Sequence, residues 1–179
     1  MKIKLMLYTI LVFYGNISYS QILPIKTITK SIEAHIIDFG IAGSKLCVAD
    51  KVESNIKIYN SDFTIWKTLK IPRKKGYEIP IVSTISDNLF NKDSLIEFIC
   101  QYNMNSDPAE QKGRIVILNE NGEVLLSTVG YQYQIKSFDT KTPKLVISDM
   151  YVNQEVKVYD LPGKLPSENF FWGTYRFPL

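Results

Sequence analysis

A chain of 179 residues with 45% hydrophobic and 22% charged residues is long enough for one folded domain and too apolar for a disordered protein. Its 21 lysines and arginines face 18 aspartates and glutamates, a formal charge of +3. Two of those lysines lie in the first four residues, and without them the balance is 19 against 18. Such a balance argues against a nucleic-acid partner, because the one basic cluster, Arg73-Lys74-Lys75, is typical of a solvated turn.

Residues 1–20 have the pattern of a cleaved secretory signal peptide. Two lysines precede an apolar run, Leu5–Tyr14, and the small residues Ser18 and Ser20 follow it. The apolar run is about half the roughly 20 residues that a membrane-spanning helix needs. The sequence therefore predicts cleavage before Gln21 and no membrane span in the mature chain. It predicts export to the periplasm, the cell surface or the extracellular medium.

After this leader the chain repeatedly alternates polar and apolar residues, the pattern of strands with one wet and one dry face. Antiparallel sheets are built from such strands. The strongest turn signal is Asn121-Gly122, which lies between two apolar runs and predicts a hairpin. In chain order, the expected strands are Ala34–Phe39, Leu46–Asp50, Ile56–Tyr59, Phe63–Ile71, Ile79–Ile85, Leu95–Tyr102, Arg114–Leu118, Val124–Val129, Tyr131–Phe138, Leu145–Asp149 and Val156–Tyr159.

The expected strands form a loose repeat with a period of about 40 to 60 residues, as in propeller blades. An apolar segment ending in aspartate, Leu46–Asp50, is followed by Ile56–Asn60, and the same order recurs as Leu145–Asp149 and Val156–Asp160. We therefore divide the expected single β domain, residues 21–179, into units at about 33–72, 79–130 and 131–179.

The repeated pattern of a hydrophobic pair, an aspartate, a short loop and Ile/Val-x-Ile/Val-Tyr-Asp/Asn resembles the blades of secreted bacterial β-propellers over residues 33–166. The resemblance implies an all-β fold of antiparallel, four-stranded, blade-like units. A closed propeller needs at least four blades, so three units leave alternatives. The alternatives are a homodimer that completes a ring, units that form a β-sandwich, and a truncated propeller. Val156–Leu165 is also similar to the opening of a C-terminal β-sandwich sorting domain, although these residues fit a third blade better.

The sequence offers no catalytic residue, metal site or cofactor. His35 is the single histidine and has apolar neighbours on an expected strand, which favours a structural role. No Gly-x-Ser-x-Gly motif or zinc ligand set is present. Asp87–Asp93 and Asn103–Asp107 are rich in oxygen ligands, but they lack the spacing of a calcium loop and are typical of turns.

Cys47 and Cys100 raise the question of a disulfide, because exported proteins meet oxidising conditions. Aligning the repeats at Asp50 and Tyr102 places Cys100 opposite Val48. We therefore expect the two thiols on opposite faces of neighbouring sheets, more than the ~7 Å apart that a disulfide allows between Cα atoms. This alignment favours two buried free thiols.

Three aromatic residues are candidates for ligand binding: Trp66, Trp172 and Tyr175. Aromatic rings can stack on a saccharide or a peptide. The sequence therefore favours an exported binding or scaffolding protein of the cell envelope, with a protein, a saccharide or a second copy as partner. The alternatives are a hydrolase or lyase that acts on extracellular polymers with carboxylates, or a propeller fragment without independent activity. An enzyme predicts titratable groups in a cleft, and a binding protein predicts an exposed aromatic patch.

Overall fold

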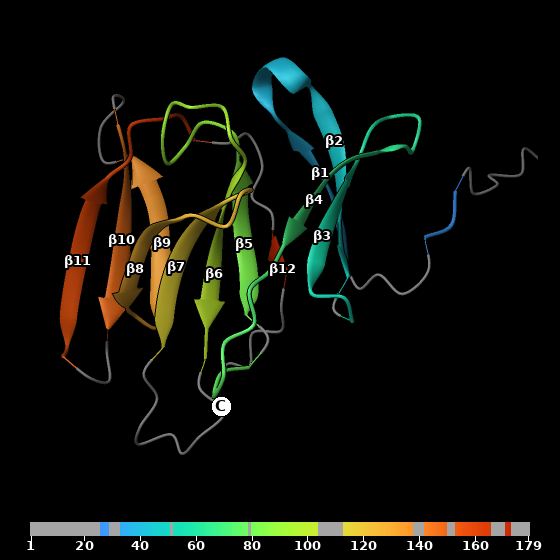
Figure 1. Ribbon diagram of the computed structural model, residues 1–179. Helices are drawn as coiled ribbons and strands as arrows, with labels where there is room; N and C mark the ends of the chain where they lie inside the picture. The colour runs from blue at the N-terminus through green and yellow to red at the C-terminus, as the bar shows by residue number, and fades with distance from the viewer. Residues whose placement is uncertain are drawn as a thin grey trace, which may run out of the picture.

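The computed structural model describes residues 26–28, 33–50, 52–78, 80–103, 113–137, 142–149, 153–165 and 171–172. Within these ranges the chain forms three antiparallel β-sheets and no α-helix, which confirms the all-β prediction. The sheets stand side by side in chain order, with the first at the right of Figure 1 and the third at the left. No helix in the described ranges is long and apolar enough to span a membrane. The predicted leader lies outside them.

The first sheet is a meander in which each strand pairs with the next one along the chain. A single 3-10 turn, Gly40–Ala42, joins the first two strands. A β-bulge interrupts the last pairing: Tyr59 lies opposite Ile65 and the preceding residue lies opposite Lys67, so Trp66 has no partner on the neighbouring strand. The strands are β1 (Glu33–Asp38), β2 (Ser44–Asp50), β3 (Asn55–Tyr59) and β4 (Ile65–Lys70).

The second sheet is a similar meander with one added strand. Its last hairpin closes at Asn121-Gly122, as predicted, where Gly122 has a φ of +82° and the Asn119 side chain accepts two backbone N–H groups of the turn. The added strand comes from much later in the chain and pairs with the first strand of the meander. The strands are β5 (Ile81–Ser86), β6 (Glu97–Tyr102), β7 (Arg114–Asn119), β8 (Val124–Val129) and β12 (Phe171–Trp172).

The third sheet has three strands within the described residues: β9 (Gln132–Ser137), β10 (Pro143–Asp149) and β11 (Glu155–Asp160). We expected four strands in each unit, but after β11 the chain crosses to the second sheet. There the backbone N–H of Gly163 donates to the carbonyl of Leu89 at 3.1 Å. A Cβ at position 163 would lie 1.5 Å from the carbonyl oxygen of Asn88, so this crossing requires a glycine.

Two apolar layers hold the three sheets together. We call the face that a sheet turns toward the next sheet in the chain its forward face, and the opposite one its backward face. The first layer joins the forward face of the first sheet to the backward face of the second: Ile37, Phe39, Cys47, Ala49, Ile56, Ile58, Leu69, Ile71, Val82, Ile85, Ile96, Phe98, Cys100, Tyr102, Val116 and Leu118. The second layer joins the second sheet to the third in the same sense: Leu89, Ile99, Ile115, Ile117, Leu145, Ile147 and Leu161.

The aspartates of the repeat pattern cap hairpins. Asp50 ends β2, and its Oδ1 accepts the backbone N–H groups of Val52 and Glu53 at 3.1 and 3.0 Å. Asp149 ends β10, and its Oδ2 accepts the backbone N–H of Asn153 at 3.0 Å. A side-chain oxygen that accepts from the next few N–H groups is how aspartate stabilises a turn. The most regular acidic positions of the chain are therefore structural.

Candidate functional site

Trp66 lies at the margin of the first layer, where the β-bulge places it. Its ring meets the ring of Phe39 nearly edge to face, with 5.6 Å between the centroids. The ammonium groups of Lys45 and Lys67 lie 5.2 and 5.0 Å from the centre of the indole, within the range of cation–π contacts. Trp66 is half-buried, and its ring already has these three partners within the protein.

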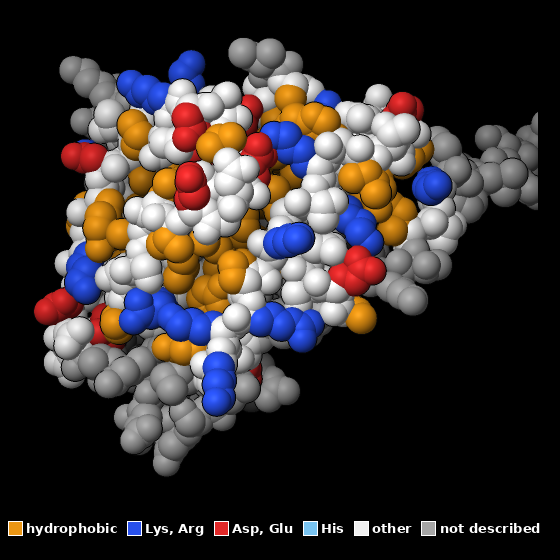
Figure 2. Space-filling model, in the orientation of Figure 1, with side chains coloured by type: hydrophobic (Ala, Val, Ile, Leu, Met, Phe, Trp, Pro, Cys, Tyr) orange, Lys and Arg blue, Asp and Glu red, His pale blue; other side chains and the backbone are white. Residues whose placement is uncertain are grey.

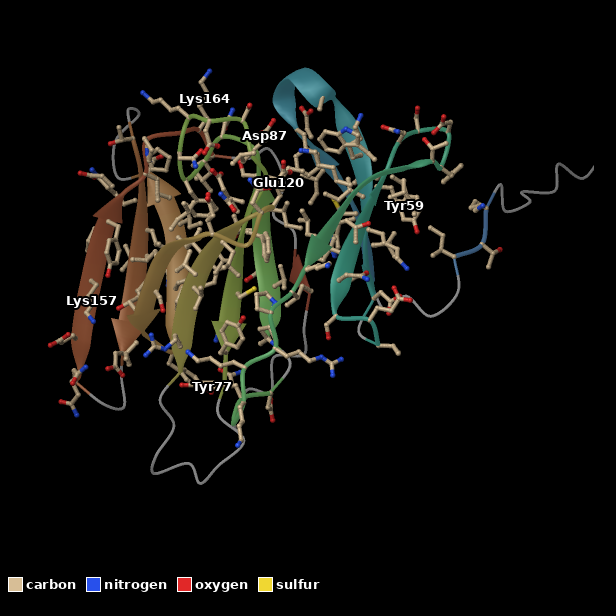
Figure 3. All side chains as sticks on the ribbon, in the orientation of Figure 1. Tyr59, Tyr77, Asp87, Glu120, Lys157 and Lys164 are labelled. Carbon is tan, nitrogen blue, oxygen red and sulfur yellow. The ribbon has the colours of Figure 1, made fainter. Side chains whose placement is uncertain are left out.

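An ion pair beside Trp66 joins the first two sheets. The Nζ of Lys67 on β4 donates to both carboxylate oxygens of Glu120, at 2.8 and 2.6 Å. Glu120 follows β7 and also accepts the backbone N–H of Ile96 at 3.4 Å. Figure 3 labels Glu120 at the upper ends of the strands, near Asp87. The group therefore closes one end of the first layer.

The three predicted ligand-binding aromatics do not lie on one sheet. Trp66 is in the first sheet, whereas the backbone of Trp172 is in β12 and pairs with Val82 of the second sheet. The side chain of Trp172 and all of Tyr175 lie outside the described part of the chain. Ligand binding by these three residues stays a prediction.

One buried carboxylate stands out in the second sheet. Glu97, the first residue of β6, is 0% exposed, and neither of its carboxylate oxygens has a hydrogen-bond partner. Burial raises the pKa of Glu97 to about 7, and the negative charges of Asp93, Asp87 and Glu120 add to the rise. The backbone N–H of Phe90 lies close enough to oppose the rise, although it makes no hydrogen bond of normal geometry. Sequence reasoning missed this site, whose one signal is a glutamate among apolar residues.

The contacts of Asp87–Asp93 agree with the turn that the sequence predicts there. Asp93 accepts the backbone N–H of Leu95 at 2.9 Å and the side-chain amide of Asn91 at 2.8 Å. Most of the second acidic run, Asn103–Asp107, lies outside the described residues. Among those described, no three His, Cys, Asp or Glu side chains are grouped to hold a metal ion. His35 is half-buried and pairs across the sheet with Cys47.

Cys47 and Cys100 are both buried, free thiols, as the sequence predicts. Both lie in the first layer. Opposite faces of successive sheets are the faces that meet, so the forward-facing Cys47 and the backward-facing Cys100 share one apolar layer. Burial raises the pKa of each thiol to about 12, which keeps both protonated and unreactive.

The two outermost sheet faces carry large exposed aliphatic side chains that are not among the residues predicted to bind a ligand. On the backward face of the first sheet, Ile36 and Ile65 are 63% and 55% exposed. On the forward face of the third sheet, Val156 and Val158 are 64% and 57% exposed. Figure 2 shows hydrophobic side chains at the surface of the first sheet, in the area where Figure 3 labels Tyr59. The sequence repeat could have predicted these side chains, because it indicates which face of its sheet each residue occupies.

No family model matches the chain, and neither a curated protein nor a solved structure matches it.

Proposed function

We propose that this protein is an exported, propeller-like binding or scaffolding protein of the cell envelope that acts through the outer faces of its sheet array. The observation that carries the proposal is the pair of aliphatic faces at the two ends of the array, with Ile36 and Ile65 on one and Val156 and Val158 on the other. Rigid sheets that present large apolar side chains to water are typical of interaction surfaces.

The chemistry of these faces favours a protein partner over a saccharide. The exposed side chains on these faces are aliphatic, and aliphatic surfaces match the apolar core of a protein interface. Saccharides stack on exposed aromatic rings, and the ring of Trp66 is already in contact with Phe39 and two lysines.

The enzyme alternative has less support. It requires a titratable carboxylate that a polymer can reach. Glu97 has a pKa of about 7, but it is fully buried. Export rests on the signal-peptide pattern of residues 1–20, and the propeller-like character rests on the repeat and on the meandering sheets.

Site-specific photocrosslinking in the organism that makes the protein tests the proposal. A benzoylphenylalanine placed at Ile65 or Val158 is expected to crosslink to a defined protein, either another copy or a different one. The control is Val124 on β8, which is 57% exposed like Val158 but lies on neither outer face. Crosslinks that are no more frequent at Ile65 and Val158 than at Val124 would overturn the proposal.

A further inference from the structure

The repeat allows the outer faces to be compared with equivalent faces that are covered. Both β3 and β11 follow the hairpin-capping aspartate of their sheet, and the strand registers match. Ile56 lies opposite Ala49 and Val156 opposite Ser148, one position before the aspartate in each sheet. Ile56 is 0% exposed in the first layer, whereas Val156 is 64% exposed. The same comparison holds one step along each strand, with Ile58 at 0% and Val158 at 57%. Among the described residues, no sheet therefore covers the forward face of the third sheet as the second sheet covers that of the first.

The backward faces also differ in exposure, but here the third sheet has the covered face and the first sheet has the exposed one. A cross-strand row in the third sheet, Ile135, Leu145 and Tyr159, packs against the second sheet. The equivalent row in the first sheet is Ile36, Leu46 and Tyr59, and the bulge continues it to Ile65. Ile36 and Ile65 are more than half exposed, although Val48 on the same face is buried. The residues are the same kind in both rows, and what differs is the presence of a neighbouring sheet.

Each contact between the described sheets joins a forward face to a backward face, and among the described residues one face of each kind is left without a neighbouring sheet. We infer that a second copy of this chain covers them, with the forward face of each third sheet packed on the backward face of the partner's first sheet. Two such contacts related by a two-fold axis close a ring of six sheets, a number within the four to eight of closed propellers. This inference rests on the proposed function and narrows it, because it names the partner.

Light scattering coupled to size exclusion, on the protein purified as the cell processes it, is expected to give twice the monomer mass. Val158→Lys places a charge on the forward face that forms the contact, and since each dimer contains it twice, the dissociation constant should rise on the order of 100-fold or more. Ile65→Lys should do the same from the other side. Val124→Lys is the matched control and should stay dimeric. All three positions are exposed in the single chain. We therefore expect the three substitutions to leave the melting temperature of the monomer unchanged.

Mixing the two monomeric variants tests the direction of the contact. A chain with Ile65→Lys keeps an intact forward face, and a chain with Val158→Lys keeps an intact backward face. One unaltered contact can form between them, so the mixture should regain a dimer that neither variant forms alone. A mixture that stays monomeric at high concentration would overturn the forward-on-backward contact. A monomeric unaltered protein would overturn the whole inference, whereas crosslinks from Ile65 or Val158 to a different protein would leave the proposed function standing.

Discussion

The two layers between the sheets are built from the same repeat but differ in polarity. The buried residues that make up the first layer are hydrophobic, and the hydroxyl of one of them, Tyr102, donates to the carbonyl of Pro72 at 2.8 Å. The second sheet turns Glu97 and Gln101 away from that layer, on the side of the third sheet, where the Gln101 amide donates to the carbonyl of Tyr131. The backward face of the second sheet thus contributes apolar packing, whereas its forward face holds polar groups, among them Glu97, that make the stability depend on pH.

The largest expected effect breaks the apolar layer. Phe98 is among its largest fully buried side chains, so Phe98→Ala should leave a cavity and lower the free energy of unfolding by about 3–5 kcal/mol. Urea denaturation followed by tryptophan fluorescence would measure it. The control is Phe90→Ala, which removes the same side chain from a half-buried position beside the second layer. Equal losses in the two variants would contradict a greater contribution from the first layer.

The next effect concerns Glu97, and its sign follows from proton linkage. The pKa is about 7 in the folded protein against 4.5 without burial, so between these values the folded state holds a proton that the unfolded state has released. Stability should therefore fall as the pH rises from about 4.5 to about 7 and stay low above that. The full shift corresponds to up to about 3 kcal/mol.

Glu97→Gln removes this titration while keeping the size of the side chain. We expect the variant to be more stable than the unaltered protein by about 1–3 kcal/mol at pH 8 and nearly equal to it at pH 4.5. Urea unfolding across this pH range would measure the difference. Glu78→Gln, at an exposed position, is the control and should leave the pH profile unchanged. A pH-independent difference for Glu97→Gln would show that the carboxylate does not titrate as inferred.

A smaller effect tests the hydrogen bonds of the second layer. The Tyr133 hydroxyl of the third sheet lies 2.5 Å from the Ser83 hydroxyl and donates to the Ser83 carbonyl at 3.1 Å. Tyr133→Phe should lower the free energy of unfolding by about 1 kcal/mol. Tyr159→Phe, on the next-but-one strand and packed against the same layer, should have almost no effect. A loss in both variants would point to ring packing rather than hydrogen bonding.

The smallest effect concerns the ion pair at the end of the first layer. A double-mutant cycle with Lys67→Met and Glu120→Gln should give a coupling free energy below about 1 kcal/mol that shrinks in high salt, because both side chains reach solvent. The exposed pair of Lys157 and Glu155, at 3.6 Å, should show no measurable coupling. A coupling of several kcal/mol that persists in high salt would mean that this link, and not the apolar contacts, fastens the two sheets.

Local patterns predicted the strands well because period-two alternation and turn residues act over a few residues. The hairpin at Asn121-Gly122 and the capping aspartates, Asp50 and Asp149, are of this kind. The sequence could not place what depends on distant packing. The bulge that turns Trp66 toward the core, the shared layer of the two thiols and the burial of Glu97 all follow from how one sheet meets another. The outer faces could have been inferred from the sequence, because Val156 and Val158 occupy the same repeat positions as the buried Ile56 and Ile58.

The pairing of β12 with β5 has a consequence for the order of folding. Trp172 lies opposite Val82, so this contact joins segments about ninety positions apart, and closing so long a loop is slow. Until β12 arrives, one edge of β5 presents unpaired backbone groups, and its residues are otherwise all buried. Such an edge is prone to pair with the wrong chain. A newly made molecule is therefore most vulnerable to aggregation in the interval after its third sheet has formed and before its last described strand is in place.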